Sequence, residues 1–265
     1  MNILITGGRG FVGGYIAKHL RSHNVYTPSR HELNLFDINS LTEFFKNHNI
    51  DIVIHCALTG REVLSSVDPV YLSDGLLMFR NLWANKHRYK KLINLGTAYE
   101  HDLSIDNSMI KEGDFINHLP LTSYGLSKNI IARIIRDTEN FYNLRIFGNF
   151  YETESDKRFF KKVIKEDAVV IANDSFIDYI YMPDIIPMIE CIINGDCQHR
   201  DINMVYPHKY RLSEMAYMLC DFMSINKNKI TIGNSNGNNL TGDSSILSSY
   251  NLKLIGLEQG LRNYK

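Results

Sequence analysis

The chain lacks an excess of charge of either sign, since its 265 residues hold 29 Lys and Arg against 29 Asp and Glu. This balance argues against a nucleic acid or an anionic membrane as a partner bound through bulk charge, although it leaves room for a local basic pocket. The chain also lacks an apolar run long enough to cross a bilayer. Its start, MNILITGG, has neither the basic nor the apolar segment of a secretion signal. We therefore expect a cytoplasmic protein.

Cysteine is scarce and scattered. The four cysteines are Cys56, Cys191, Cys197 and Cys220. They form no Cys-x-x-Cys pair, so we expect reduced and mostly buried thiols. No close grouping of Cys and His has metal-ligand spacing, and the run Glu100, His101, Asp102 lacks partner histidines. We therefore expect no metal site and interpret this run as loop residues.

Short apolar runs alternate with stretches of helical periodicity through the first 150 residues. The expected strands are 2–6, 24–28, 51–57, 91–96 and 143–148, and the expected helices are 11–23, 39–49, 69–87 and 123–141. Either Asn39 or Ser40 is the expected N-cap of the second helix. Because parallel strands need helical crossovers, the alternation predicts an α/β fold with a doubly wound parallel sheet.

The pattern loosens beyond residue 150. Helical spacing occurs at 157–167, 182–194, 212–223 and 257–264, short strands are expected at 168–172 and 201–206, and the polar stretch 233–245 is an expected loop. We predict a nucleotide-binding domain over residues 1–150. Residues 151–265 are expected to form a smaller substrate-binding α/β lobe, within which the chain has room to return to the sheet.

A glycine-rich turn joins the first expected strand to the first helix. In TGGRGFVG, Gly7 permits a tight turn, Gly10 lets the backbone approach a pyrophosphate, and Gly13 lets helix and strand pack closely. The helix start, with Phe11 and Val12, supplies free N–H groups and a positive dipole end for an anion. Since this triplet follows a strand and opens a helix, it predicts a dinucleotide site.

The end of the second strand indicates which dinucleotide is bound. NAD sites usually carry an acid there, but Ser29 and Arg30 follow Thr27 and Pro28 in this chain. With Arg9 inside the glycine turn, two cations and a hydroxyl suit the 2′-phosphate of NADP. The alternative is that both arginines are solvent-exposed charges, and NAD remains the alternative cofactor.

Five more residues complete the expected nucleotide site. Asp37 is a candidate to accept a hydrogen bond from the adenine amino group, with helix capping as the alternative, and Ile38 adjoins it. Ala57 follows the third strand, and His55 and Cys56 are expected to pack on the adenine side of the cofactor.

Tyr124 stands four positions before Lys128 in a helical stretch, so both side chains lie on one face. The pair is either an amphipathic surface pair or a catalytic phenol beside a cation. At this point the chain resembles the extended short-chain dehydrogenase/reductase family. TGGRGFVG matches the cofactor motif of that family, YGLSK matches Tyr-x-x-x-Lys, and Thr97 in LGT holds the place of its catalytic Ser or Thr. Residues 29–57 are most similar to the branch of GDP-fucose synthases and nucleotide-sugar 4-ketoreductases.

The resemblance implies a Rossmann fold and a mechanism. Tyr124 would act as the acid/base, and the Lys128 ammonium would bring the pKa of the phenol toward neutrality and bind the nicotinamide ribose. Thr97 would donate a hydrogen bond to the substrate carbonyl oxygen. The implied partner is a nucleotide-sugar substrate, and the implied assembly is a homodimer formed through helices 69–87 and 122–141.

The chain also departs from the family pattern. Ile177 replaces the arginine that binds the substrate diphosphate, which shifts that role to Arg158 or Lys161, or else to Arg200 or Arg211. Tyr99 holds the place of the cysteine used in epimerisation. The candidate substrate residues are Tyr99, Asn149, Arg158 and Arg211. We therefore expect an NADP(H)-dependent reductase of a nucleotide-linked 4-keto-6-deoxy sugar, in deoxysugar biosynthesis. The alternatives are a 4-epimerase with tightly bound NAD and a non-catalytic dinucleotide-binding regulator.

Overall fold

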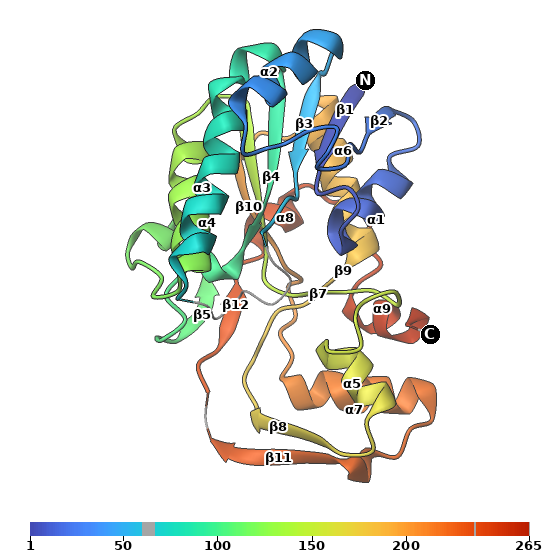
Figure 1. The fold of residues 1–265 in the computed structure, drawn as a ribbon. Helices are drawn as coiled ribbons and strands as arrows, with labels where there is room; N and C mark the ends of the chain where they lie inside the picture. Colours follow the sequence, from blue (N-terminus) through green and yellow to red (C-terminus); the bar gives the residue numbers. More distant parts are fainter. Residues whose placement is uncertain (60–66, 236, 265) are drawn as a thin grey trace. The chain divides into compact units, whose positions relative to one another are not determined.

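The structure is a computed structural model that describes residues 1–59, 67–235 and 237–264. The chain forms two compact units (Figure 1). The first comprises 1–102, 113–145 and 189–202, and the second comprises 103–112, 146–188 and 203–265. Residues 189–202 belong to the first unit, a return of the chain for which the expected division at residue 150 left room, and residues 103–112 belong to the second.

The first unit is built on a six-stranded sheet with the order β10-β6-β4-β3-β1-β2. The strands are β1 (Asn2–Thr6), β2 (Asn24–Tyr26), β3 (Ile52–His55), β4 (Lys91–Thr97), β6 (Phe141–Ile146) and β10 (Asp201–Met204). The pairings of β1 with β2, of β1 with β3 and of β3 with β4 are parallel. Because the chain moves from β1 outward to β2 and then back to β3, the strand order reverses between β1 and β3.

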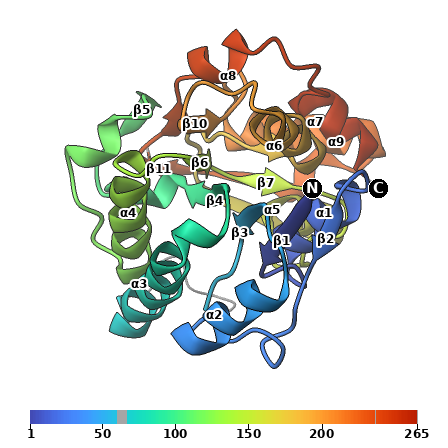
Figure 2. The same cartoon turned by 90° about the horizontal axis from the view of Figure 1, so that it is seen from above.

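Helices cover both faces of this sheet, and Figure 2 shows α2, α3 and α4 together on one face. The helices are α1 (Phe11–His19), α2 (Ile38–Asn47), α3 (Pro69–Ala84), α4 (Ser123–Arg136) and α6 (Ile185–Asn194), with short turns η1 (Lys86–Arg88), η2 (Ala98–Glu100) and η3 (Asp114–Ile116). Side-chain caps start three of them: Asp37 for α2, Asp68 for α3 and Thr122 for α4. Each cap satisfies a backbone N–H that the helix itself leaves unpaired.

The core beneath α2, α3 and α4 is formed by side chains from strands and helices together. Its buried members include Leu4, Leu41, Phe45, Val53, Phe79, Leu92, Ile131 and Phe141. These residues come from the apolar strands and from one face of each helix, as the periodicity predicts. The doubly wound α/β fold expected from the sequence is thus confirmed.

The second unit contains three parallel strand pairs and four α-helices. The pairs are β5 (Asn107–Ile110) with β12 (Leu240–Gly242), β7 (Asn149–Phe150) with β9 (Ile180–Tyr181), and β8 (Val169–Asn173) with β11 (Ile230–Ser235). The helices are α5 (Phe159–Lys165), α7 (Leu212–Met223), α8 (Ser245–Ser249) and α9 (Leu257–Asn263), with turns η4 (Met182–Asp184) and η5 (Lys227–Lys229). Phe150 packs against Phe160 and Tyr181, with ring centroids 4.9 and 5.2 Å away.

Two local expectations are wrong. The N-cap of α2 is Asp37 instead of Asn39 or Ser40, because the Asp37 carboxylate accepts the Asn39 N–H at 2.9 Å. The expected loop 233–245 contains the end of β11 and all of β12. A polar sequence forms strands there because each segment pairs with a partner distant in the chain, β8 or β5.

The thiols and the apolar segments agree with the composition. All four cysteines are free; Cys197 and Cys220 are buried, and Cys56 and Cys191 are half-buried. Among the described residues, no helix combines the length and the apolarity needed to cross a membrane.

We predict that Gly13→Ala destabilises the glycine turn. A Cβ at residue 13 would lie 2.5 Å from the Gly7 carbonyl oxygen, a backbone atom that has no rotamer to adopt. The expected loss is about 1–3 kcal/mol in the free energy of unfolding, measured by urea titration.

Gly14→Ala is the matched control, because its Cβ would lie 3.2 Å from the nearest atom. Alanine favours a helix over glycine by about 1 kcal/mol, so this variant should match or exceed the wild-type stability. Equal stabilities of the two variants would disprove the packing role of Gly13.

Candidate active site

A cavity opens where the strand order reverses, at the carboxyl ends of β1 and β3. Its volume is ≈ 290 Å³. Its lining comprises Thr6, Gly7, Gly8, Arg9, Gly10, Pro28, Ser29, Arg30, Leu33, Leu35, Phe36, Ala57, Leu58, Thr59 and Met78. In open α/β sheets, ligands bind at this topological position. Six residues expected from the sequence line the cavity: Gly7, Arg9, Gly10, Ser29, Arg30 and Ala57.

The glycine turn leaves no space for side chains. Gly7 has φ +69°, and a Cβ on it would lie 2.8 Å from the Ala57 backbone. Gly10 is the N-cap of α1 without a side-chain hydrogen bond to the helix. A helix start of this kind favours an anion, through its dipole and its N–H groups.

The basic end of the cavity has one acid that the sequence analysis missed. Glu32 accepts the Ser29 N–H at 2.6 Å, and its carboxylate lies 3.7 Å from the Arg9 guanidinium. Hydrogen bonds from Ser29 hold the pKa of Glu32 below its usual value. The Arg30 guanidinium lies 5.0 Å from the centre of the Phe36 ring. Arg9 therefore shares its charge with Glu32, whereas Arg30 faces an aromatic ring.

Six expected cofactor residues do not belong to the described lining of this cavity: Phe11, Val12, Gly13, Asp37, Ile38 and Lys128. Gly13 packs on the turn, and Asp37 caps α2, which was the alternative for it. The apolar wall formed by Leu33, Leu35 and Phe36 was missed. These residues follow β2 in an irregular segment, so no periodicity marked them.

A second, smaller hollow contains the Tyr124 end of the site. It is lined by His55, Ala57, Leu58, Thr59, Tyr71, Gly75, Met78, Tyr124, Ser127, Lys128 and Ile131. Ala57, Thr59 and Met78 are among the residues that line both hollows, so the two adjoin each other. His55 lines this hollow and bonds Thr6, which lines the first cavity. Its expected packing on the adenine side of the cofactor stays a prediction. Cys56 is absent from both described linings.

Thr97 and Tyr124 meet in this part of the structure. Thr97 ends β4, and its side chain lies close enough to Tyr124 on α4 to influence the pKa of the phenol. The Tyr99 ring lies edge-on to Tyr124, with centroids 5.8 Å apart. Lys128 is 8% exposed, and its Nζ donates to the Leu95 carbonyl at 3.0 Å. The structure thus brings the three expected catalytic side chains together and buries the pair on α4, so that pair is no surface feature.

The electrostatics of Tyr124 differ from the expectation. Burial raises the pKa of Tyr124 above its usual value, while the Thr97 side chain opposes that rise. Burial also lowers the pKa of Lys128. The expected lowering of the Tyr124 pKa is therefore not found in this structure, because burial of the phenol is the largest influence on that pKa.

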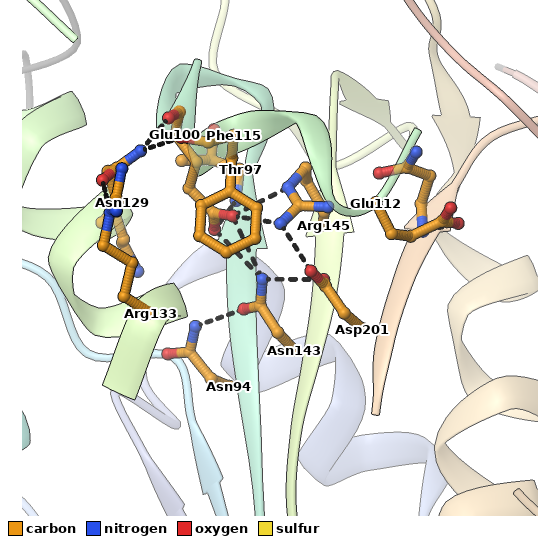
Figure 3. Close-up of polar contacts among 12 residues, drawn as sticks. Asn94, Thr97, Glu100, Glu112, Phe115, Asn129, Arg133, Asn143, Arg145 and Asp201 are labelled. Carbon is orange, nitrogen blue, oxygen red and sulfur yellow. Dashed lines mark hydrogen bonds and ion pairs between the residues drawn. The ribbon is translucent and has the colours of Figure 1, made fainter. Parts of the chain in front are cut away.

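A buried polar cluster lies directly behind Thr97, and Figure 3 shows it. Glu100 and Arg145 are both 0% exposed, and the Arg145 guanidinium lies 2.7 Å from the Glu100 carboxylate. Asp201 on β10 accepts a second bond from Arg145 at 2.9 Å. The expectation that Glu100 and His101 are loop residues near the site holds for His101, which lies outside any helix or strand, whereas Glu100 ends η2; both side chains are buried. No periodic signal marked this cluster, because its members come from segments that are distant in the chain.

The candidate substrate residues of the second unit are already engaged. Arg158 donates to the carboxylate of Glu154 at 2.8 Å and also bonds Asn149. Arg211 is exposed, and it donates to the Asp174 carbonyl and lies 4.5 Å from the centre of the Phe176 ring. Lys161 lies over the Tyr264 ring at 4.9 Å.

A third hollow, within the second unit, is lined by Leu103, Phe159, Val170, Ile171, Ala172, Asn173, Ser175, Ile177, Leu212, Gly237 and Asn238. Its described lining contains Ile177 but neither Lys nor Arg. In the first unit, Arg200 donates to the Thr138 carbonyl. Among the described residues, no group of three or more His, Cys, Asp or Glu side chains is arranged to hold a metal ion.

Residues 3–203 match the NAD dependent epimerase/dehydratase family, so the chain belongs to that family. A GDP-L-colitose synthase of Yersinia pseudotuberculosis is 30% identical over 164 residues, which are 57% of this chain and 53% of that protein. The chain thus aligns with about half the length of that curated relative.

Solved structures share the fold over nearly the whole chain. The dTDP-4-dehydrorhamnose reductase of Bacillus anthracis, in complex with NADP, matches with a TM-score of 0.84, covering 99% of this chain and 96% of that one at 16% identity. A GDP-mannoheptose C4 reductase of Campylobacter jejuni, with NADP bound, matches with a TM-score of 0.83, covering 98% and 96% at 19% identity.

We predict that acid destabilises the protein through two buried histidines. Burial lowers the pKa of His55 to about 3 and that of His101 to about 3. Because the unfolded chain binds these protons near pH 6.5 and the folded chain does not, the stability is present above pH 6.5 and is lost as the pH falls toward 3. At pH 5 each histidine should cost about 2 kcal/mol.

Urea unfolding of the wild type and of His101→Leu at pH 7.5 and pH 5 measures this loss. The variant should lose about 2 kcal/mol less than the wild type between the two pH values. His31→Asn, at an exposed position, is the control and should behave as the wild type. An unchanged loss in His101→Leu would contradict the prediction.

Proposed function

We propose that the protein is an NADP(H)-dependent reductase of a nucleotide-linked 4-keto-6-deoxy sugar. The observation that carries the proposal is the meeting of Thr97, Tyr124 and Lys128 next to a cavity with a basic end. The named activities of the relatives, a GDP-L-colitose synthase and reductases of nucleotide-linked sugars, support it. The homodimer through α3 and α4 is part of the same proposal.

The residues of the first unit fit the dinucleotide. The glycine turn closes where Cβ atoms at Gly7 and Gly13 would strike backbone, so main chain can approach a pyrophosphate there. Ser29 and Arg30, with Arg9, would hold the 2′-phosphate of the adenosine, and Lys128 would hold the nicotinamide ribose. When bound, NADPH supplies the hydride that reduces the keto carbon.

Thr97 and Tyr124 would stabilise the keto oxygen of the substrate and supply the proton that it receives. Thr97 would donate a hydrogen bond to the keto oxygen and stabilise the negative charge that develops on it. Tyr124 would deliver the proton to the same oxygen. Because burial raises its pKa, the phenol stays protonated at neutral pH, as a proton donor must. The acceptor oxygen becomes an alkoxide, a much stronger base than a phenolate, so a high phenol pKa does not prevent the transfer.

The diphosphate of the substrate needs a partner in place of Ile177. Arg158 and Arg211 remain our candidates, together with Asn149, and Tyr99 is the candidate contact in the first unit. Arg211 is the cation more available to a diphosphate, since its guanidinium bonds a backbone carbonyl in the described contacts, whereas Arg158 is paired with the buried carboxylate of Glu154. A 4-epimerase with tightly bound NAD is the second candidate function. Glu32 favours it, since an acid near the end of β2 suits the ribose hydroxyls of NAD.

We predict that NADPH binds at least about tenfold tighter than NADH, a difference of about 1.4 kcal/mol. Arg30→Ala should remove most of this preference. It should weaken the binding of NADPH and leave that of NADH unchanged, since the Arg30 guanidinium would bind the 2′-phosphate that only NADPH carries. Arg9→Ala should have a smaller effect, because Arg9 already faces Glu32. Fluorescence titration of the purified protein measures the affinities.

Arg21→Ala is the control, because Arg21 is exposed and lies outside the described cavity lining. Equal affinities for NADPH and NADH in the wild type would refute the role of the two arginines. A purified protein that retains NAD would favour the epimerase instead.

We predict that Tyr124→Phe slows turnover by about 10²–10⁴ while keeping the fold and the cofactor affinity, because it removes one hydroxyl. Lys128→Met should lower both turnover and NADPH affinity. Thr97→Val should lower turnover with little effect on NADPH affinity. The assay follows NADPH oxidation with 4-keto-6-deoxy sugars linked to GDP, dTDP, UDP or CDP.

Tyr142→Phe is the matched control, since Tyr142 is also buried but lies on β6, outside the described lining of both hollows. It should retain the wild-type rate. A Tyr124→Phe variant with more than half of that rate would rule out the mechanism.

A further inference from the structure

The buried cluster behind Thr97 has a function beyond stability. We propose that the carboxylate of Glu100, held by Arg145, positions the Thr97 hydroxyl for reaction. The inference rests on the proposed function, in which Thr97 bonds the keto oxygen. Glu100 is thus a positioning residue, since it acts on Thr97 and not on the substrate.

The first step of the argument is the short turn η2 that follows Thr97. The Thr97 N–H donates to Glu100 Oε1 at 3.0 Å, and the Tyr99 N–H donates to the Thr97 hydroxyl oxygen at 3.3 Å. The second bond occupies a lone pair of that oxygen, so the hydroxyl proton is directed elsewhere, toward Tyr124 and the proposed substrate oxygen. The carboxylate of Glu100 therefore fixes the backbone from which this hydroxyl projects.

The second step is what fixes Glu100. Its carboxylate oxygens accept Arg145 Nε at 2.7 Å and Asn143 Nδ2 at 3.1 Å, and both donors project from β6. Asn143 is oriented in turn by Asn94, whose amide donates to it at 2.7 Å. Phe115 covers the Arg145 guanidinium at 5.0 Å. Figure 3 shows Asn143 and Arg145 directed at the Glu100 carboxylate, with Asn94 bonded to Asn143.

The third step links the turn to α4. Asn129, next to Lys128 in the chain, donates to the Glu100 carbonyl at 2.7 Å. A Cβ at Gly125 would lie 2.5 Å from the Tyr99 carbonyl, so the turn packs directly on the helix that carries Tyr124. Glu100 thus fixes the position of Thr97 relative to Tyr124. Its side chain bonds the Thr97 backbone, and its carbonyl bonds Asn129 on the helix that carries Tyr124.

The chemistry requires a carboxylate at residue 100. Thr97 N–H, Asn143 Nδ2 and Arg145 Nε are all donors, and an ionised Glu100 has two acceptor oxygens to meet them. A glutamine has the same shape but one acceptor oxygen. Whichever way its amide turns, its NH₂ group faces either the Thr97 N–H or Arg145, donor against donor.

The test compares three variants. Glu100→Gln should displace Thr97 and lower kcat about 10–100-fold, as expected for a misplaced catalytic group, with NADPH affinity unchanged. Asp201→Asn is the matched control, because Asp201 also bonds Arg145 but, among the described residues, makes no hydrogen bond to Thr97, and it should retain kcat within about twofold. Glu100→Gln/Arg145→Met should recover much of kcat, since the lone amide oxygen is then free to accept the Thr97 N–H.

A readout independent of activity accompanies the assay. In protein labelled with ¹⁵N-threonine, the Thr97 amide signal is assigned by its absence in Thr97→Val. This signal should shift in Glu100→Gln, stay in place in Asp201→Asn and return toward the wild-type position in the double variant. If Glu100→Gln does not fold, the double variant still tests the proposal, because it removes both charges of the buried ion pair together. Its Thr97 amide signal and its kcat are then the two readouts.

A Thr97 signal that is unchanged in Glu100→Gln would overturn the proposal, and so would a double variant as slow as the single one or a control as slow as Glu100→Gln. A wild type inactive on every keto-sugar tested would refute the proposed function instead. The amide signal would then still decide whether Glu100 holds Thr97.

Discussion

The ion pair between Glu100 and Arg145 is the interaction on which the rest of the site depends. Both side chains are fully buried, so neither charge is solvated, and removal of Arg145 would leave the Glu100 carboxylate without its ionic partner inside the protein. The Glu100 carboxylate accepts the Thr97 N–H, and its carbonyl accepts the side chain of Asn129 on α4. The pair therefore ties the end of β4 to β6 and to the helix that carries Tyr124 and Lys128.

Burial affects both of the proposed reactive groups on α4, Tyr124 and Lys128. It raises the pKa of Tyr124 and lowers that of Lys128, so it favours the neutral form of each. A neutral phenol is what a reductase needs before hydride transfer, since the proton must still be present to be given. The same environment keeps His55 neutral, which limits the positive charge beside Lys128.

The glycine turn and the end of β3 impose a second constraint. Gly7 approaches the Ala57 backbone so closely that residue 7 has no space for a side chain. This close approach lies where the strand order reverses, between β1 and β3. The cavity forms at that point because the two chain segments leave the sheet in opposite directions. Arg9, Arg30 and Glu32 then give the cavity one charged end, and Tyr124 and Lys128 lie at the other hollow.

The sequence by itself determined the doubly wound sheet and the glycine turn, because each follows from a local period or a fixed spacing. The catalytic set of Thr97, Tyr124 and Lys128 came from the resemblance to a known family, and it stays a proposal. Only the tertiary structure decided the role of Glu100, the pairing of Arg9 with Glu32 and the place of His55. Glu100, Arg145 and Asp201 come from three separate segments, and no pattern within one segment marks them. The direction of the Tyr124 pKa was also decided there, because burial depends on residues distant in the chain that pack around the phenol.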